Sequence, residues 1–211
     1  MFFVCLHFIC SDSWHLFLFF KQSYERAALE VHFVHFNTKY GELKKAIKEG
    51  DGLAVVGMML YPSKDPSKAS SKIGQYLIEQ LYGPLQRMER SSSNPVSMQV
   101  DVARYIEEIT SSKDKAMYFR YLGSLTTPGC FESVTWTVMS HRFDVDATLM
   151  SQFRRVIVDG DFGRGNYRAI QKLNGRTVYT NDPKATGSSS IATATSTLLF
   201  IAVTFAFFTK W

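Results

Sequence analysis

Glu30-Val31-His32-Phe33-Val34-His35-Phe36 is the stretch from which the fold of this chain is most readily predicted. Successive residues of a strand point to opposite faces of a sheet, so Val31, Phe33 and His35 would share one face. Glu30, His32, Val34 and Phe36 would share the other. The near-continuous apolar run from Leu53 to Leu60, which ends at Tyr61-Pro62, predicts a buried strand.

Further strands and a few short helices are predicted along the rest of the chain. Strands are expected at 118–121 and 134–139, and helices at 73–88, 100–109 and 147–156. Pro84 would end or kink the first helix, and Asp146 is a plausible N-cap for the last. Strands with few helices between them predict a sheet-dominated α+β domain.

Composition and charge are those of an ordinary globular domain. Of the 211 residues 45% are hydrophobic, which suffices for a core without a disulfide scaffold. The net charge of +5 comes from scattered lysines, and no basic run with interleaved aromatic residues occurs. The pattern indicates a solvated surface and does not support nucleic-acid binding.

Glu30 and His32 form the most informative pair among the polar residues. Two residues apart on a strand, they face the same side, where the carboxylate can accept a hydrogen bond from the ring nitrogen that does not bind a metal. His35 faces the other side and cannot join the same site. By spacing alone, a hydrogen-bonded core histidine is the favoured interpretation of His32.

Three blocks of sequence resemble the alpha class of carbonic anhydrases. Ala28–Tyr40 resembles the segment that carries the third zinc histidine, and Tyr121–Trp136 resembles a later family motif. Asn166–Arg176 resembles the closing segment, although Ala169 and Lys172 stand where prolines are expected. The resemblance implies a central, mostly antiparallel, twisted sheet with short peripheral helices. It divides the chain into an unmatched apolar segment (1–22), a partial enzyme domain (23–183) and a tail (184–211).

The resemblance also implies a zinc site that hydrates carbon dioxide reversibly to bicarbonate and a proton. His32 matches a zinc ligand, and Glu30 matches the carboxylate that orients it. Thr126 matches the threonine that orients the attacking hydroxide, and Thr127 is its neighbour in the site. The apolar wall that receives carbon dioxide is matched by Val34, Val55, Leu125, Val134 and Trp136.

The first two zinc histidines of the family, a His-x-His pair on the preceding strand, have no counterpart in the sequence. His7 is the nearest candidate, but Ile9 would then stand in the second position. Only about the last three-fifths of the family domain is matched, so we expect an N-terminally truncated or mis-assembled gene product that holds zinc poorly. A non-catalytic binding module at the cell surface is the alternative.

Cys130 matches a cysteine that, in secreted members of the family, pairs with a cysteine of the unmatched region. Cys5 or Cys10 could take the place of that partner.

The C-terminal tail resembles a lipid-anchor signal. Small polar residues at 184–190 precede a mild spacer at 191–197 and an apolar block at 198–208. This order predicts a glycolipid anchor and a location on the extracellular face of the plasma membrane. A single membrane span over 191–208 and a secreted, soluble protein are the alternatives.

Overall fold

The computed structural model describes residues 2–7, 27–63, 65, 75–76, 79–80, 83, 101–153, 168–169, 171–183 and 191–193. The strands in this part of the chain are β1 (Phe2–His7), β2 (Leu29–Phe36), β3 (Leu53–Ser63), β4 (Tyr118–Gly123), β5 (Val134–Met139), β6 (Phe143–Asp146), β7 (Val178–Thr180) and β8 (Ile191–Thr193). The helices are η1 (Thr38–Tyr40), α2 (Leu43–Ala46), α4 (Val102–Thr110) and α5 (Ala147–Phe153).

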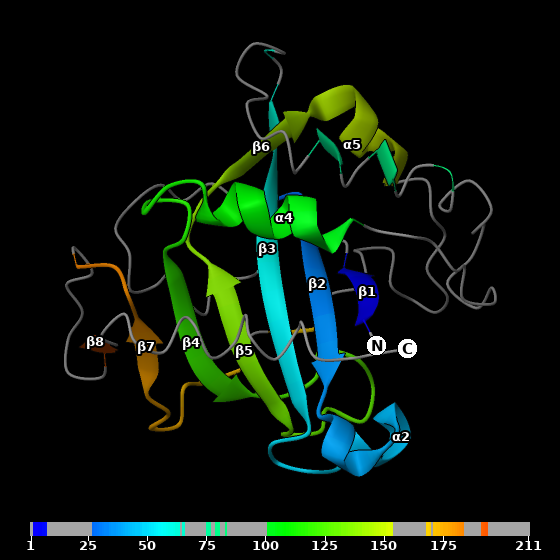
Figure 1. Ribbon diagram of the computed structural model, residues 1–211, viewed down its shortest axis with the longest axis vertical. Coiled ribbons are helices and arrows are strands. Elements are labelled where there is room, and N and C mark those ends of the chain that lie inside the picture. The colour runs from blue at the N-terminus through cyan, green and yellow to red at the C-terminus, as the bar shows by residue number, and fades with distance from the viewer. Residues whose placement is uncertain are drawn as a thin grey trace.

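All the described strands join one sheet, in the order β1-β2-β3-β5-β4-β7-β8, with β6 paired to β3 beyond β5 (Figure 1). The β1–β2, β2–β3, β4–β5 and β4–β7 ladders are antiparallel. Parallel ladders join β3 to β5, β3 to β6 and β7 to β8. The predicted sheet-dominated α+β class is confirmed.

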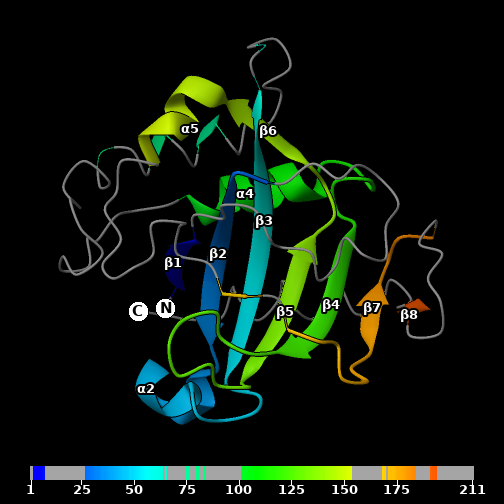
Figure 2. The ribbon, with the colours of Figure 1, turned by 180° about the vertical axis from the view of Figure 1, so that it is seen from behind.

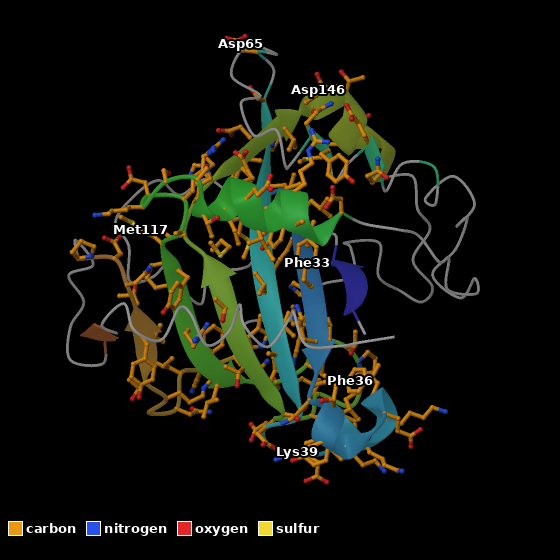
Figure 3. The ribbon with its side chains drawn as sticks, in the orientation of Figure 1. Phe33, Phe36, Lys39, Asp65, Met117 and Asp146 are labelled. Carbon is orange, nitrogen blue, oxygen red and sulfur yellow. The ribbon has the colours of Figure 1, made fainter. Side chains whose placement is uncertain are left out.

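One face of the sheet packs against α4, which crosses in front of β2 and β3 in Figure 1 and behind them in Figure 2. Val31 and Phe33 of β2 are buried there, and the Phe33 ring stacks on Tyr105 of α4 with centroids 4.4 Å apart. Phe33 lies beneath the helix in Figure 3. Asp101 caps the helix by accepting a hydrogen bond from the Arg104 backbone N–H at 3.1 Å. The alternation of β2 therefore places Val31 and Phe33 on one face, as predicted, and that face lies under α4.

The opposite face of the sheet carries a second core. Its buried members include Leu53, Val55, Val134, Trp136 and Val138, from β3 and β5. The connection between β4 and β5 lies over this face in Figure 2, on the side away from α4. Since α4 and the connection cover different faces, the connection and the polar residues of β2 meet on the same side of the sheet.

Several elements differ in extent from their predictions. β3 continues through Pro62 to Ser63, where it pairs with β6, a four-residue strand that was not predicted. A proline near a strand end removes only one ladder hydrogen bond, so the strand can pass through it. α4 begins two residues later and ends one residue later than the helix predicted at 100–109. α5 begins at residue 147, where the helix at 147–156 was predicted to begin. The Asp146 side chain caps α5 by accepting from the Thr148 N–H at 2.7 Å.

The predicted helix at 73–88 lies mostly outside the described residues, although its described positions 75–76, 79–80 and 83 are helical. In the tail, Ile191–Thr193, predicted as spacer, forms β8 beside β7. The apolar block at 198–208 lies outside the described residues. Within the described part of the chain, no helix is both long and apolar enough to span a bilayer.

Candidate metal centre

His32 and Glu30 meet on β2, on the face away from α4. The His32 Nε2 lies 2.5 Å from the Glu30 Oε1, and the two side chains are only 3% and 12% exposed. A carboxylate at Nε2 fixes the proton on that nitrogen and directs the lone pair to Nδ1. The pair therefore has the arrangement of a metal-ligating histidine and its orienting carboxylate, with Nδ1 as the nitrogen for the metal. His35 is separate from it, because its Nδ1 bonds the Ala54 carbonyl at 3.1 Å.

The Trp136 ring of β5 packs against the His32 ring. The two ring centroids are 4.7 Å apart at an interplanar angle of 73°, which is an edge-to-face contact. The indole N–H donates to the Ser124 carbonyl at 3.1 Å, and this bond fixes the ring orientation. Gly57 of β3 lies between the two strands, opposite His32 in the register. A Cβ at Gly57 would lie 3.5 Å from Glu30 Oε1 and 3.6 Å from Trp136, so larger side chains would displace both.

The five residues predicted as the apolar wall pack in one cluster. Val55, Val134 and Trp136 are buried, and Val34 and Leu125 are partly buried against them. They come from β2, β3, β5 and the β4–β5 connection, so the sheet order brings together residues up to about a hundred positions apart. Their role in receiving carbon dioxide stays a prediction.

The β4–β5 connection carries Thr126 and Thr127, both half-buried. The Leu125 N–H donates to the Phe131 carbonyl at 3.0 Å, and the Cys130 N–H donates to the Thr127 carbonyl at 3.1 Å. Gly129 and Cys130 adopt positive φ angles of 101° and 45°, which close the turn. Within the described part of the chain, Cys130 forms no disulfide. These bonds give the two threonines a defined position beside Leu125.

Arg168, in the block that resembles the closing segment, bonds the same connection. It was not among the predicted site residues. Its Nη1 donates to the Ser124 Oγ at 2.5 Å and to the Leu125 carbonyl at 3.2 Å. Ser124 also accepts the Trp136 N–H through its carbonyl, so Arg168 and Trp136 fix the residues just before Thr126. The only signal in the sequence was the position of Arg168 within the block that resembles the family's closing segment.

Tyr121 of β4 packs beside Trp136, with stacked rings whose centroids are 6.4 Å apart. Burial raises the pKa of the Tyr121 phenol, and the negative charge of Glu30 raises it further. The phenol is therefore neutral at physiological pH.

β1 lies beside β2 in the position of a preceding strand. The register pairs Cys5 with His32 and His7 with Glu30. The structure describes the backbone of β1 and not its side chains. Among the side chains that are described, no three His, Cys, Asp or Glu residues are grouped to hold a metal ion. Among the described side chains His32 is thus the one candidate ligand with an orienting carboxylate, and the metal-binding roles of His32 and His7 both stay predictions.

Residues 21–182 match the model of the eukaryotic-type carbonic anhydrase family. Carbonic anhydrase 15 of Mus musculus is 28% identical over 176 residues, which cover 80% of this chain and 51% of the relative. The putative carbonic anhydrase 5 of Caenorhabditis elegans is 31% identical over 182 residues, which cover 82% of this chain and 53% of the relative. Carbonic anhydrase 6 of Bos taurus is 28% identical over 158 residues, or 74% and 46% of the two chains. The chain spans about half the length of these curated relatives.

Proposed function

Because this chain belongs to the eukaryotic-type carbonic anhydrase family, we propose that it catalyses the zinc-dependent, reversible hydration of carbon dioxide to bicarbonate and a proton. The observation that carries the proposal is the buried His32–Glu30 pair, with its 2.5 Å contact, placed against Trp136 of the apolar cluster. The reaction needs a basic nitrogen that binds the metal and, next to it, an apolar surface that excludes water and accepts carbon dioxide.

Each residue of the site has a defined part in the proposal. Zinc, when bound, acts as a Lewis acid and makes water nucleophilic at neutral pH. His32 would hold it through Nδ1, while Glu30 keeps the ring in the required tautomer and orientation. Val55, Val134 and Trp136 exclude water from the place where carbon dioxide rests. Thr126 would orient the attacking oxygen, positioned by a connection that Arg168 and Trp136 fix.

Stopped-flow hydration of carbon dioxide by the purified, zinc-loaded 211-residue chain tests the proposal. Because the sequence offers one credible zinc ligand, we expect only a small rate above that of the buffer, and His32→Ala should abolish it. His35→Gln is the matched control, because His35 lies on the same strand and bonds the Ala54 carbonyl instead. A chain with bound zinc and no hydration, or an unchanged rate in His32→Ala, would contradict the proposal.

A non-catalytic binding module is the second candidate function. It is favoured by the sequence, in which the family's His-x-His pair of zinc ligands has no counterpart. A folded chain that contains no zinc after dialysis against excess metal, and does not hydrate carbon dioxide, would support the binding module over the enzyme.

We further propose that the chain is held at the extracellular face of the plasma membrane by a glycolipid. The order of small residues, spacer and apolar block over 184–208 supports this proposal. Treatment of expressing animal cells with a phosphatidylinositol-specific phospholipase C should release the protein into the medium. A membrane-spanning tail would resist the lipase, and that result would overturn the glycolipid anchor.

A further inference from the structure

The helix α4 covers only part of the sheet face against which it packs. It crosses in front of β2 and β3, and the lower parts of β4, β5 and β7 have no described helix in front of them (Figure 1). Arg120 and Leu122 of β4 lie on this face, and the ladders place Tyr179 of β7 opposite Arg120. Thr137 and Thr135 of β5 lie opposite Arg120 and Leu122. We call these five residues the open patch.

The open patch exposes apolar surface. Leu122 is 65% and Tyr179 is 43% exposed, and both are large side chains that a sheet normally buries. They lie diagonally across the ladder between β4 and β7, because Tyr179 is opposite Arg120 and Arg120 is two residues from Leu122. The two side chains therefore form one surface and are not separate exposed residues.

The charge of the open patch is positive. The Arg120 Nε donates to the Thr137 Oγ1 at 3.1 Å, and the guanidinium lies 5.0 Å from the centroid of the Tyr118 ring. These contacts hold the guanidinium in place, and among the described residues its two Nη groups bond to none. A guanidinium binds phosphate oxygens, and tyrosine is enriched where a protein meets lipid headgroups. Together with an exposed leucine, this chemistry fits the surface of a phospholipid bilayer.

The course of the chain brings the open patch close to such a surface. β7 carries Tyr179 and ends at Thr180, and the small residues 187–189, which suit the attachment of a glycolipid, follow seven to nine residues later. A residue spans at most about 3.6 Å, so the attachment point lies within about 25–32 Å of the end of β7. A short tether raises the effective concentration of a weak binding surface, so a small patch suffices for contact.

We propose that the open patch rests on the phospholipid bilayer to which the chain is tethered. Leu122 and Tyr179 lie among the headgroups, and Arg120 binds a lipid phosphate. The proposal rests on the membrane tether proposed above, but not on whether the tether is a glycolipid or a membrane span. His32 packs against Trp136 on the opposite face of the sheet, so the contact turns the candidate metal centre away from the bilayer.

Quenching of tryptophan by brominated phosphatidylcholine tests which face meets the bilayer, because bromine quenches only an indole that reaches the lipid. The protein from expressing animal cells is reconstituted into vesicles of plain or brominated phosphatidylcholine, and the wild type gives the background of its native tryptophans. We expect Tyr179→Trp to lose its added fluorescence in the brominated vesicles. Phe131→Trp is the matched control and should keep it, because Phe131 is 40% exposed on the β4–β5 connection, over the opposite face (Figure 2).

Photo-cross-linking of the unaltered protein gives a second measurement, which depends on no variant. A phosphatidylcholine that carries a diazirine is added to the vesicles, and the labelled positions are located by peptide fragmentation. Labels should fall on Leu122 and Tyr179 and be absent from Phe131.

Three results would overturn the proposal while the tether stands. They are a Tyr179→Trp chain that floats with the vesicles and is not quenched, equal quenching of the two variants, and a label on Phe131 without one on Tyr179. Shielding of Tyr179→Trp from iodide that grows with protein concentration in the absence of lipid would assign the open patch to a second copy of the chain, and would also overturn it. A chain that does not float with the vesicles would contradict the tether and this proposal together. None of these readouts depends on the hydration of carbon dioxide.

Discussion

At the scale of single residues, the candidate site depends on how Glu30 presents His32. The 2.5 Å contact joins two side chains that are almost completely removed from water. A hydrogen bond to a charged partner is stronger and more directional than a neutral one in such surroundings. Trp136 adds a contact with the ring that a solvent-exposed histidine would lack. The ring is consequently oriented before any metal arrives.

Replacement of this carboxylate should weaken metal binding without removing a ligand. We expect Glu30→Gln to raise the zinc dissociation constant by about 10- to 100-fold, the usual cost of losing an orienting partner. Competition with a fluorescent chelator measures the constant. Glu42→Gln, on the exposed residue before α2, is the control and should bind zinc as the wild type does. Equal affinity in Glu30→Gln would show that the carboxylate does not orient His32.

At the scale of elements, the end of β4 is shaped to receive the indole of Trp136 from β5. A Cβ added at Gly123 would lie 2.9 Å from the Trp136 Cδ1 and 3.0 Å from the Tyr121 Cε2. The indole cannot move aside easily, since it is buried and bonded to the Ser124 carbonyl. Because Gly123 has no side chain, the end of β4 and the connection that carries Thr126 can lie close to the rings of Trp136 and Tyr121.

We therefore expect Gly123→Ala to destabilise the fold by about 1–3 kcal/mol, the usual range for overpacking. The midpoint of urea unfolding, at constant slope, measures the loss. Gly57→Ala is the matched control, because a Cβ there meets its neighbours at ordinary contact distances of 3.5–3.6 Å. It should not lower the midpoint. Equal midpoints for the two variants would contradict the close packing at Gly123.

At the scale of the whole molecule, the sheet has a core on each face, and two partly buried histidines lie outside the candidate metal centre. They are His35 on β2 and His141 in the connection between β5 and β6. Burial lowers the pKa of His35 on β2, and the bond to the Ala54 carbonyl offsets this only in part. Burial likewise lowers the pKa of His141, and the charge of Lys115 lowers it further. The carboxylates of Glu108, Asp144 and Asp114 offset this lowering only in part. Both side chains are therefore held neutral in the folded protein.

This arrangement predicts a loss of stability in mild acid. The unfolded chain takes up these protons near the ordinary histidine pKa of about 6.5, whereas the native state resists them. Their contribution is present above pH 6.5 and is lost as the pH falls through the lower, native values. Urea unfolding at a series of pH values between 7 and 5 should show falling midpoints. The double variant His35→Gln/His141→Gln should show a shallower fall, and an unchanged slope would contradict the prediction.

The sequence by itself determined the features that depend on neighbouring residues. The alternation at 30–36 identified β2 and its two faces, and the apolar run identified β3, because burial imposes a period on the chain locally. The strand at 134–139 was predicted with the bounds that the structure has. The family also followed from the sequence, since its motifs are contiguous.

Only the tertiary structure decided which distant residues meet. β3 pairs in parallel with β5 and β6, and Arg168 bonds a serine 44 positions away. The pairing of β1 with β2, which places Cys5 opposite His32, also could not be predicted from the spacing of residues in the sequence. The physical reason is that a strand accepts a partner at any sequence distance. Its register is chosen by the match of buried faces across the ladder, and not by the residues next to it in the chain.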